Sequence, residues 1–177
     1  MALLSPDEWT ALLTGCERSV AHLEMRDVYA VDDEDDMFAR WKRDTPPNSA
    51  ELREWWQDWI DLLAPLSSTG RGVRRARIVS EPVTDYIAYE WEITSGNILA
   101  GEDVRWLPRR RASDLCLPGN DFWLIDDTTV VWNHFSGKGQ WSANEVSRDA
   151  SAVALCVRAF DAVWERAVPH KDYSPLR

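Results

Sequence analysis

The densest pattern of hydrophobic and polar positions lies between residues 100 and 146, where it predicts four successive β-strands. The segments are AGEDVRWLP, PGNDFWLIDD, TVVWNHF and QWSANEVS. Each one alternates apolar and polar side chains or forms a short apolar run, and turn-forming residues separate them. Between the second and third segments, Asp126-Asp127-Thr128 is typical of a tight hairpin turn.

Two segments nearer the N-terminus, VAHLEMRDVYAV and VRRARIVS, also have strand patterns. In the first, Leu23 and Met25 share one face, and His22 lies on the other, where we expect it at the surface. Asp27 falls on the apolar face. A buried carboxylate there needs a partner, whereas a position at the strand end would leave it in solvent, and the sequence leaves both open.

Helix signals flank these strands. Ser5-Pro6-Asp7-Glu8 begins a short helix that Gly15 ends, because Ser caps it, Pro suits the first turn and Glu closes a capping box. The acidic run DDEDD predicts the start of another short helix over residues 33–43. Asp149 is expected to cap a long C-terminal helix.

The strongest helix pattern runs from Ser49 to about Ala64, where Pro65 is expected to stop it. Its large apolar residues recur at helical spacing and are Leu52, Trp55, Trp56, Trp59, Leu62 and Leu63. The later segment TDYIAYEWEITSGN fits either a strand or a helix. We predict a helix that begins at Pro82 to Thr84 and ends at Gly96, because its length suits a crossover between parallel strands.

The order of these elements predicts a single domain over residues 1–177, of the α/β class and on the borderline of α+β. We expect a mixed, mostly antiparallel sheet of five or six strands, flanked by helices. The final residues, 169–177, are expected to form a loose tail. The chain has neither an internal repeat nor a linker that would suggest a second domain.

Composition narrows the range of functions. The formal net charge of −10 disfavours nucleic acid and anionic membranes as partners, because both bind to basic surfaces. No apolar run is long enough for a spanning helix, and the first residues do not resemble a secretory signal. The three cysteines, Cys16, Cys116 and Cys156, are widely spaced, which fits reduced thiols. We therefore expect a cytoplasmic protein.

Two basic stretches, Arg71–Arg77 and Arg109–Arg111, depart from the acidic character of the chain. We expect these arginines to pair with acidic residues, and phosphate binding is the alternative. The eleven tryptophans are expected mostly in the core, although Trp is also common at interfaces. Trp55, Trp59 and Trp106 are the candidates for a partner-binding surface.

No complete catalytic signature is present. Carboxylates near predicted strand ends could hold Mg²⁺ or act as an acid and a base. They are Glu81, Glu102, Asp103, Asp121, Asp126 and Asp127. The chain has no nucleophile elbow, Walker loop, dinucleotide fingerprint or HExxH motif, and no lysine follows these acids in the spacing of nuclease sites. If the protein is an enzyme, Asp126, Glu102 and His134 are the candidate catalytic residues, and neither a metal nor another cofactor is expected.

A cluster of polar residues is the candidate ligand site. Glu90 lies on the apolar side of the predicted crossover helix, where it would need a cation. The candidate cations are Arg26, Arg75 and Arg105, and the candidate ligand-binding residues are Glu24, Arg26, Glu81, Tyr86, Glu90 and Arg105. A purely structural network of ion pairs would use the same residue types, so both interpretations stay open.

The strings LEMRDVYA, RRARIVSEPVTDY, AGEDVRWLP and DFWLIDD precede a C-terminal helix that ends near Trp164. As a set they resemble a family of short, acidic actinobacterial proteins classed as a domain of unknown function. The likeness covers most of the chain. It implies a gene near a helix-turn-helix regulator and such a regulator as the protein partner, and it implies no known activity.

Two strings also resemble one half of the phospholipase-D-like fold. Gly101–Leu107 is similar to its middle strand, and Phe122–Asp126 is similar to its strand that ends in Asp. In the HxKxxxxD spacing anchored on Asp126, Gly119 takes the His position and Asp121 takes the Lys position. Both chemical groups of that mechanism are missing, so the resemblance implies a degenerate, non-catalytic half.

Together these features predict a non-enzymatic regulatory module that binds a small ligand or a protein partner and works with a DNA-binding regulator. The alternative is a hydrolase or a metal-dependent, nuclease-like enzyme that uses the strand-end carboxylates. Three carboxylates around one point in an open cleft would favour the enzyme. An exposed aromatic patch would favour the protein partner.

Overall fold

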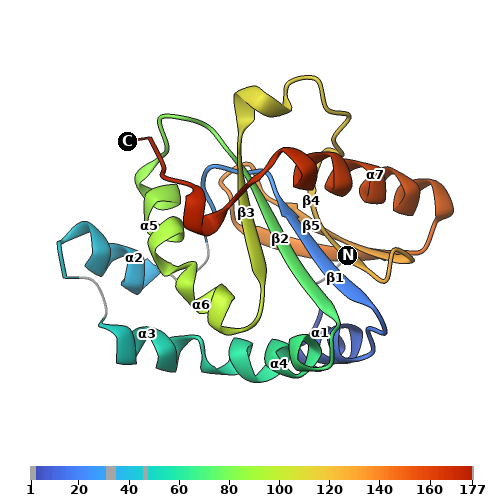
Figure 1. The fold of residues 1–177 in the computed structure, drawn as a ribbon, viewed down its shortest axis with the longest axis horizontal. Coiled ribbons are helices and arrows are strands. Elements are labelled where there is room, and N and C mark those ends of the chain that lie inside the picture. The colour runs from blue at the N-terminus through green and yellow to red at the C-terminus, as the bar shows by residue number, and fades with distance from the viewer. Residues whose placement is uncertain (1–2, 31–34, 46–47, 177) are drawn as a thin grey trace.

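The computed structural model describes residues 3–30, 35–45 and 48–176. At its centre is a mixed seven-stranded sheet in the order β6-β5-β4-β1-β2-β3-β7 (Figure 1). The strands are β1 (Ser19–Glu24), β2 (Gly72–Val79), β3 (Asp103–Pro108), β4 (Asp121–Ile125), β5 (Thr129–Phe135), β6 (Trp141–Ser147) and β7 (Val168–Pro169). The α/β class is confirmed. The sheet has seven strands rather than the expected five or six, because β7 is too short to carry a pattern.

The middle of the sheet is parallel and its flanks are antiparallel. β1 pairs with β2 and β2 with β3 in parallel, and the remaining neighbours are antiparallel, as expected. Between β1 and β2 the chain forms α2 (Asp35–Lys42), α3 (Ser49–Trp55) and α4 (Gln57–Ser68), and between β2 and β3 it forms α5 (Asp85–Ile93) and α6 (Ser95–Leu99). Right-handed crossovers that move in the same direction place their helices on the same face.

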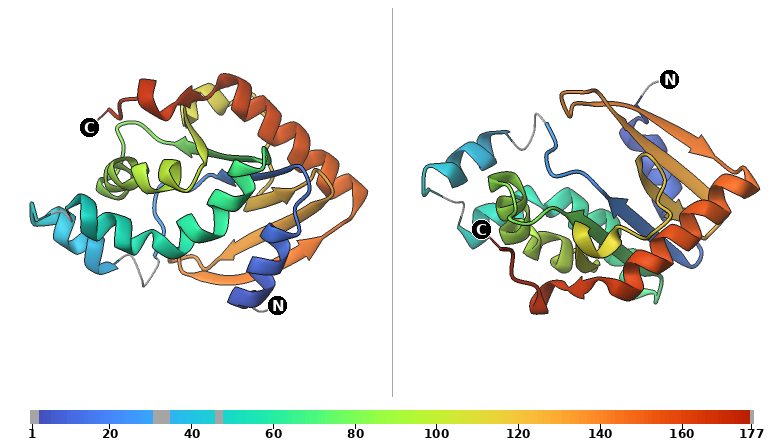
Figure 2. Two further views of the ribbon diagram at one scale, coloured as in Figure 1. Left: turned by 60° about the horizontal axis from the view of Figure 1, so that its bottom comes forward. Right: turned by 90° about the horizontal axis from the view of Figure 1, so that it is seen from above.

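Helices cover both faces of the sheet. α1 (Pro6–Thr14) and α4 pack on one face through Leu13 and Leu63, and α7 (Ala150–Arg166) packs on the other through Val153 and Phe160. Figures 1 and 2 show α7 across one face and α1, α4, α5 and α6 on the opposite side. Because both faces are covered, the alternating side chains of the central strands are buried in both directions. His22, expected at the surface, is therefore only 6% exposed.

Most of the predicted helix signals are confirmed. Ser5 forms the capping box with Glu8 at the start of α1, and Asp149 caps α7. The ambiguous segment is helical, with Thr84 as the N-cap of α5. The acidic run does precede a short helix, α2, although the expected start at residues 33–34 lies outside the described residues.

The helix expected from Ser49 to Ala64 is instead two helices that meet at Trp56. The Trp56 ring packs so closely against α6 that a Cβ added to Gly96 would collide with it. The break between α3 and α4 places this ring against α6. Gly96 lies inside α6 and is not the end of the predicted crossover helix. Pro65 does not stop α4, which continues to Ser68. The buried side chains of Leu63 and Leu66 hold these turns on the sheet although Pro65 cannot donate a backbone hydrogen bond.

The C-terminal segment is docked rather than loose. β7 pairs with β3, a short 3₁₀ helix follows over His170–Asp172 (η3), and Tyr173 stacks on Trp106 with ring centroids 5.5 Å apart. The indole N–H of Trp91 also donates to the Tyr173 carbonyl, at 3.1 Å. These aromatic contacts are distant in sequence, so the local composition of the tail could not predict them.

Two further local predictions are resolved by the backbone. Asp126 and Asp127 have φ values of 54° and 56°, which a type I′ turn between β4 and β5 requires. Asp27 accepts hydrogen bonds from Ser80 and pairs with Arg109 at 3.2 Å, so it has partners near the end of β1. Within the described ranges, no helix combines the length and the apolar character that a membrane span needs.

Candidate ligand-binding pocket

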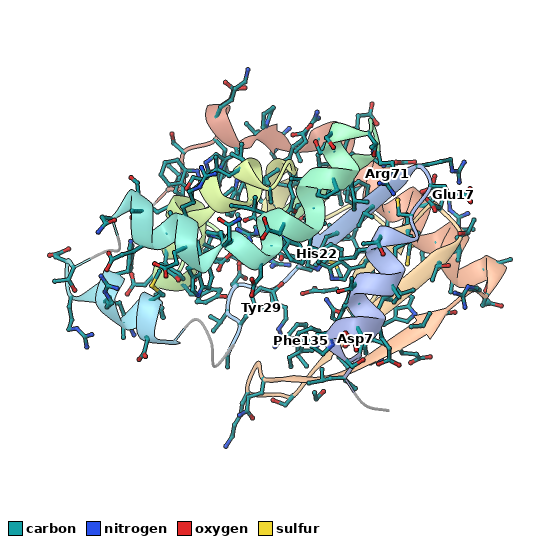
Figure 3. All side chains as sticks on the ribbon, turned by 90° about the horizontal axis from the view of Figure 1, so that it is seen from below. Asp7, Glu17, His22, Tyr29, Arg71 and Phe135 are labelled. Atoms are coloured by element: carbon teal, nitrogen blue, oxygen red, sulfur yellow. The ribbon has the colours of Figure 1, made fainter. Side chains whose placement is uncertain are left out.

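A cavity of about 690 Å³ lies on the face of the sheet that α1 and α4 partly cover. Figure 3 looks onto this face and shows His22, Tyr29 and Phe135 in the space between α1 and the layer of α3 and α4. The polar and charged residues that line the cavity are Thr10, His22, Glu24, Asp58, Arg75, Arg77, Glu90, Asp121 and Asn133. Its aromatic residues are Trp9, Tyr29, Trp56, Trp59, Tyr86, Trp123, Phe135 and Trp141.

Glu24 links two buried arginines at the floor of the pocket. In the parallel register of β1 and β2, Glu24 lies opposite Arg77 and His22 lies opposite Arg75, so alternate residues of both strands point to the same face. One carboxylate oxygen of Glu24 contacts Arg75 Nη1, and the other contacts Arg77 Nε. The period of two in each strand therefore creates this cluster.

Each arginine also contacts a second carboxylate. Arg75 Nε donates to Glu102 Oε2 at 2.7 Å, and Arg77 Nη2 lies 2.6 Å from Glu90 Oε2. Glu102 additionally accepts the Trp59 indole N–H at 2.7 Å, so the pocket wall is tied to the ion pairs. The network thus includes the crossover helix, the start of β3 and the two central strands.

The electrostatics of the network follow from burial and pairing. Burial would raise the pKa of Glu24, but Arg77 and Arg75 outweigh burial and hold this pKa well below its ordinary value. Burial also raises the pKa of Glu90, and Arg77 offsets this effect only in part. Glu24 is therefore an anion at neutral pH, and both arginines remain cations, because the neighbouring carboxylates outweigh burial and raise the pKa values of Arg75 and Arg77.

His22 is neutral and lies in a chain of polar side chains. Burial holds its pKa well below the ordinary value. Asn144 Nδ2 donates to Asn133 Oδ1 at 2.9 Å, and Asn133 Nδ2 lies 3.5 Å from His22 Nε2. This order assigns the proton to His22 Nδ1, which is 3.4 Å from Glu24 Oε1 but makes no well-directed hydrogen bond.

Asp121 begins β4 and is 2% exposed. Its carboxylate accepts the Met25 backbone N–H at 2.9 Å and the Tyr29 hydroxyl at 2.5 Å. The pKa of Asp121 is raised to about 6, because burial and the charge of Glu24 outweigh the hydrogen bond from Tyr29. This is an ionisable group with an unusual pKa at the edge of a cavity, which is typical of functional sites.

Aromatic rings form two walls of the pocket. In the first, Trp123 stacks on His22 at 3.8 Å and meets Trp9 and Trp59 edge-on, with centroids 5.6 and 5.8 Å apart. In the second, Tyr29 meets Phe135 edge-on at 5.2 Å. A flat apolar group could be held between these walls above the polar floor.

Of the six predicted ligand-binding residues, Glu24, Tyr86 and Glu90 line the pocket. The other three lie elsewhere and are Arg26, Glu81 and Arg105. The Arg26 guanidinium lies 5.0 Å over Phe135, next to the pocket, whereas Glu81 accepts the Tyr173 hydroxyl. Arg105 lies 4.1 Å over Trp164, on the face covered by α7.

The predicted catalytic residues do not come together. Asp126 accepts the backbone N–H groups of residues 17–19, which lower its pKa to about 2 although burial opposes this. Glu102 pairs with Arg75, and His134 Nε2 lies 3.2 Å from Glu145 on the neighbouring strand. Across the described part of the chain, no group of three or more His, Cys, Asp or Glu side chains is arranged to hold a metal ion.

The three predicted partner-binding tryptophans occupy different environments. Trp106 is fully buried, Trp59 lines the pocket, and Trp55 packs against Trp56 with ring centroids 4.9 Å apart. They form no shared surface patch. The two basic stretches are largely paired, as expected: Arg75 and Arg77 lie in the network, and Arg109 and Arg110 bind Asp27 and Glu81.

Sequence reasoning missed His22 and Asp121 as pocket residues, and Arg77 as the partner of Glu90. One signal could have identified the arginine. In VRRARIVS the residues at alternate positions, Arg75 and Arg77, share a face in an otherwise apolar central strand, and buried arginines require carboxylate partners.

A model of the family described as Domain of unknown function (DUF6879) matches residues 7–175, which is nearly the whole chain. No curated protein shows a significant match to the sequence.

Proposed function

We propose that this chain, which belongs to the DUF6879 family, is a non-enzymatic regulatory module that binds a small ligand in its aromatic pocket. The observation that supports this proposal is the cavity of about 690 Å³, with aromatic walls over a floor of hydrogen-bonded charges. Ligand sites of proteins are typically clefts of roughly 300–1,000 Å³ with mostly apolar linings and a few polar groups. The pocket has this size and this division of surface.

The floor of the pocket has the rigidity that a binding site needs. Glu24, Arg75 and Arg77 hold one another through ion pairs, and Glu102 links this cluster to Trp59 in the wall. Side chains fixed in this way lose little conformational entropy when a ligand binds. The network therefore supports a preformed site.

The regulatory part of the proposal rests on the resemblance to actinobacterial proteins encoded near helix-turn-helix regulators. We infer a cytoplasmic protein whose ligand changes its association with such a regulator. The net charge of −10 favours contact with the regulator over direct contact with DNA.

A hydrolytic enzyme is the second candidate, and one observation favours it. Asp121 has a pKa of about 6 beside a cavity, which would suit general acid or base catalysis. Among the strand-end carboxylates, Asp126 and Glu102 are held in separate interactions, so an enzyme would use Asp121 instead. Ligand that is bound and recovered unchanged supports the binding module, whereas conversion that Asp121→Asn abolishes supports the enzyme.

The experiment that tests the pocket is a thermal-shift screen with a library of small metabolites. Thr10 is an exposed residue of α1 that lines the cavity, so Thr10→Trp is expected to fill the pocket without entering the core. Thr14→Trp adds the same ring one turn further along α1, outside the cavity, and is the matched control.

We expect at least one compound to raise the Tm of the wild type and of Thr14→Trp by about 5–10 °C at saturating concentration, and to leave Thr10→Trp unchanged. Compounds that stabilise Thr10→Trp as strongly as the wild type would place the binding site elsewhere. A screen in which no compound stabilises the wild type would contradict the proposal.

A further inference from the structure

Asp121 carries a charge that the described residues balance only in part, through the nearby Arg26. The other carboxylates at the floor of the pocket all pair with its two arginines. Asp121 accepts hydrogen bonds from Met25 and Tyr29 but has no ion-pair partner within the described residues. A buried carboxylate without a cation destabilises a fold, so its presence beside a cavity points to a ligand that supplies the positive charge.

We propose that the pocket binds a small organic cation, a protonated amine attached to an apolar or aromatic body, with its nitrogen at Asp121. This inference rests on the proposed function and names the class of ligand for the same pocket. The amine would donate hydrogen bonds to lone pairs of Asp121 that Met25 and Tyr29 leave open, since a carboxylate has acceptor sites for more than two donors.

The arginines are not available to an anionic ligand. Arg75 lies between Glu24 and Glu102, and Arg77 lies between Glu24 and Glu90. A phosphate or carboxylate ligand would have to displace one of these carboxylates from its arginine, and Glu90 or Glu102 displaced in this way would lose its ion-pair partner. The charge pattern of the floor therefore selects against anions.

The aromatic walls suit the body of such a ligand and add to the attraction for its charge. Tyr29 both donates to Asp121 and packs against Phe135, so rings lie next to the carboxylate. Cations are attracted to ring faces, and the protein already uses this contact with two rings of the pocket lining. The guanidinium of Arg75 lies 5.4 Å over Trp123, and that of Arg26 lies 5.0 Å over Phe135.

The test compares three probes of similar size and different charge, measured by isothermal titration calorimetry at neutral pH. They are phenethylamine, which is a cation, 2-phenylethanol, which is neutral, and phenylacetate, which is an anion. We expect phenethylamine to bind about 10-fold tighter than 2-phenylethanol, because a charged hydrogen bond is stronger than a neutral one. Phenylacetate should bind most weakly.

Two variants assign the charge effect to a residue. Asp121→Asn keeps an acceptor for the Met25 N–H and removes the charge, so phenethylamine affinity should fall about 10-fold while 2-phenylethanol affinity stays within about 2-fold. Asp58→Asn removes the same charge from an exposed residue of the pocket lining. Because solvent screens Asp58, this control should change phenethylamine affinity by about 2-fold or less.

The outcomes separate this inference from the proposed function. If the amine and the alcohol bind equally well to wild type and to Asp121→Asn, the inference about charge is wrong and the pocket remains a ligand site. If none of the three probes binds, the inference about an organic amine is contradicted, and the thermal-shift screen decides separately whether the pocket binds another ligand.

The wild-type protein gives an independent arm that does not depend on a folded variant. The charged and titratable groups that face Asp121 are Glu24 on β1, and Arg26 and Tyr29 in the segment after it, and the pKa of Asp121 is about 6. Phenethylamine affinity should therefore fall as the pH is lowered through this value, while 2-phenylethanol affinity should not. Amine affinity that stays constant through this range would overturn the assignment to Asp121.

Discussion

At the scale of single residues, the pocket contrasts a balanced charge with an unbalanced one. Glu24 is mostly buried between two arginines, which hold its pKa low. Asp121 is also buried but accepts hydrogen bonds only from neutral donors, and burial raises its pKa to about 6. The same chemical group, a carboxylate, therefore stabilises the fold at Glu24 and destabilises it at Asp121.

This contrast predicts how stability depends on pH. An acid whose pKa is raised by folding contributes stability at low pH and loses it as pH rises through the folded pKa. For Asp121 the change from an ordinary pKa of 3.8 to about 6 corresponds to about 3 kcal/mol. Asp121→Asn removes this loss. We expect its free energy of unfolding, relative to the wild type, to increase by up to about 3 kcal/mol between about pH 4 and pH 7.

Urea unfolding of both proteins at the two pH values measures this difference. Glu8→Gln is a suitable control, since Glu8 is an exposed capping residue whose pKa is lowered, and its stabilising effect should change with pH in the opposite sense. If the free energies of unfolding of Asp121→Asn and the wild type differ by the same amount at both pH values, the charge of Asp121 does not destabilise the fold.

At the scale of elements, α6 fits beneath the pocket wall because its second residue lacks a side chain. A Cβ on Gly96 would lie 2.1 Å from ring atoms of Trp56, which lines the pocket at the junction of α3 and α4. Two helices distant in sequence thus fix one aromatic ring of the site.

Gly96→Ala is expected to destabilise the protein by about 1–3 kcal/mol, as overpacking does. This sign is diagnostic, because Gly to Ala inside a helix normally stabilises by roughly 0.5–1 kcal/mol. Thermal and urea unfolding measure the effect. Gly119→Ala is the matched control, because no atom lies within 4 Å of its added Cβ, and it should be nearly neutral. A Gly96→Ala variant as stable as the wild type would show that Trp56 moves freely.

Element positions could be predicted where the signal is local. Caps at Ser5, Thr84 and Asp149 and the turn at Asp126 and Asp127 are confirmed because each depends on a few neighbouring residues. The break at Trp56 could not be predicted, because it depends on contact with Gly96, far along the chain.

At the scale of the whole molecule, the alternation of apolar and polar residues predicted the class of the sheet. It did not predict that both faces of the central strands are buried. A strand with one polar face usually exposes it, which is the reason His22 was expected in solvent. Here helices cover both faces, so the polar faces of β1 and β2 meet in the interior and form the floor of the pocket. The site is thus a consequence of topology, and only Glu24, Tyr86 and Glu90 among the predicted ligand residues line it.

The tryptophans give the most direct measurement of whether this pocket binds a ligand. Among the eleven in the chain, five line the cavity and are Trp9, Trp56, Trp59, Trp123 and Trp141. Trp132 and Trp164 pack on the opposite face, against the core beneath α7, and are internal controls.

Two-dimensional ¹H–¹⁵N NMR with assigned indole signals reports on both groups during a titration with phenethylamine. We predict that indole N–H signals of the cavity group shift in a saturable way, while those of Trp132 and Trp164 stay in place. Saturable shifts confined to Trp132 and Trp164, or shifts in neither group, would contradict binding of the amine between the aromatic walls.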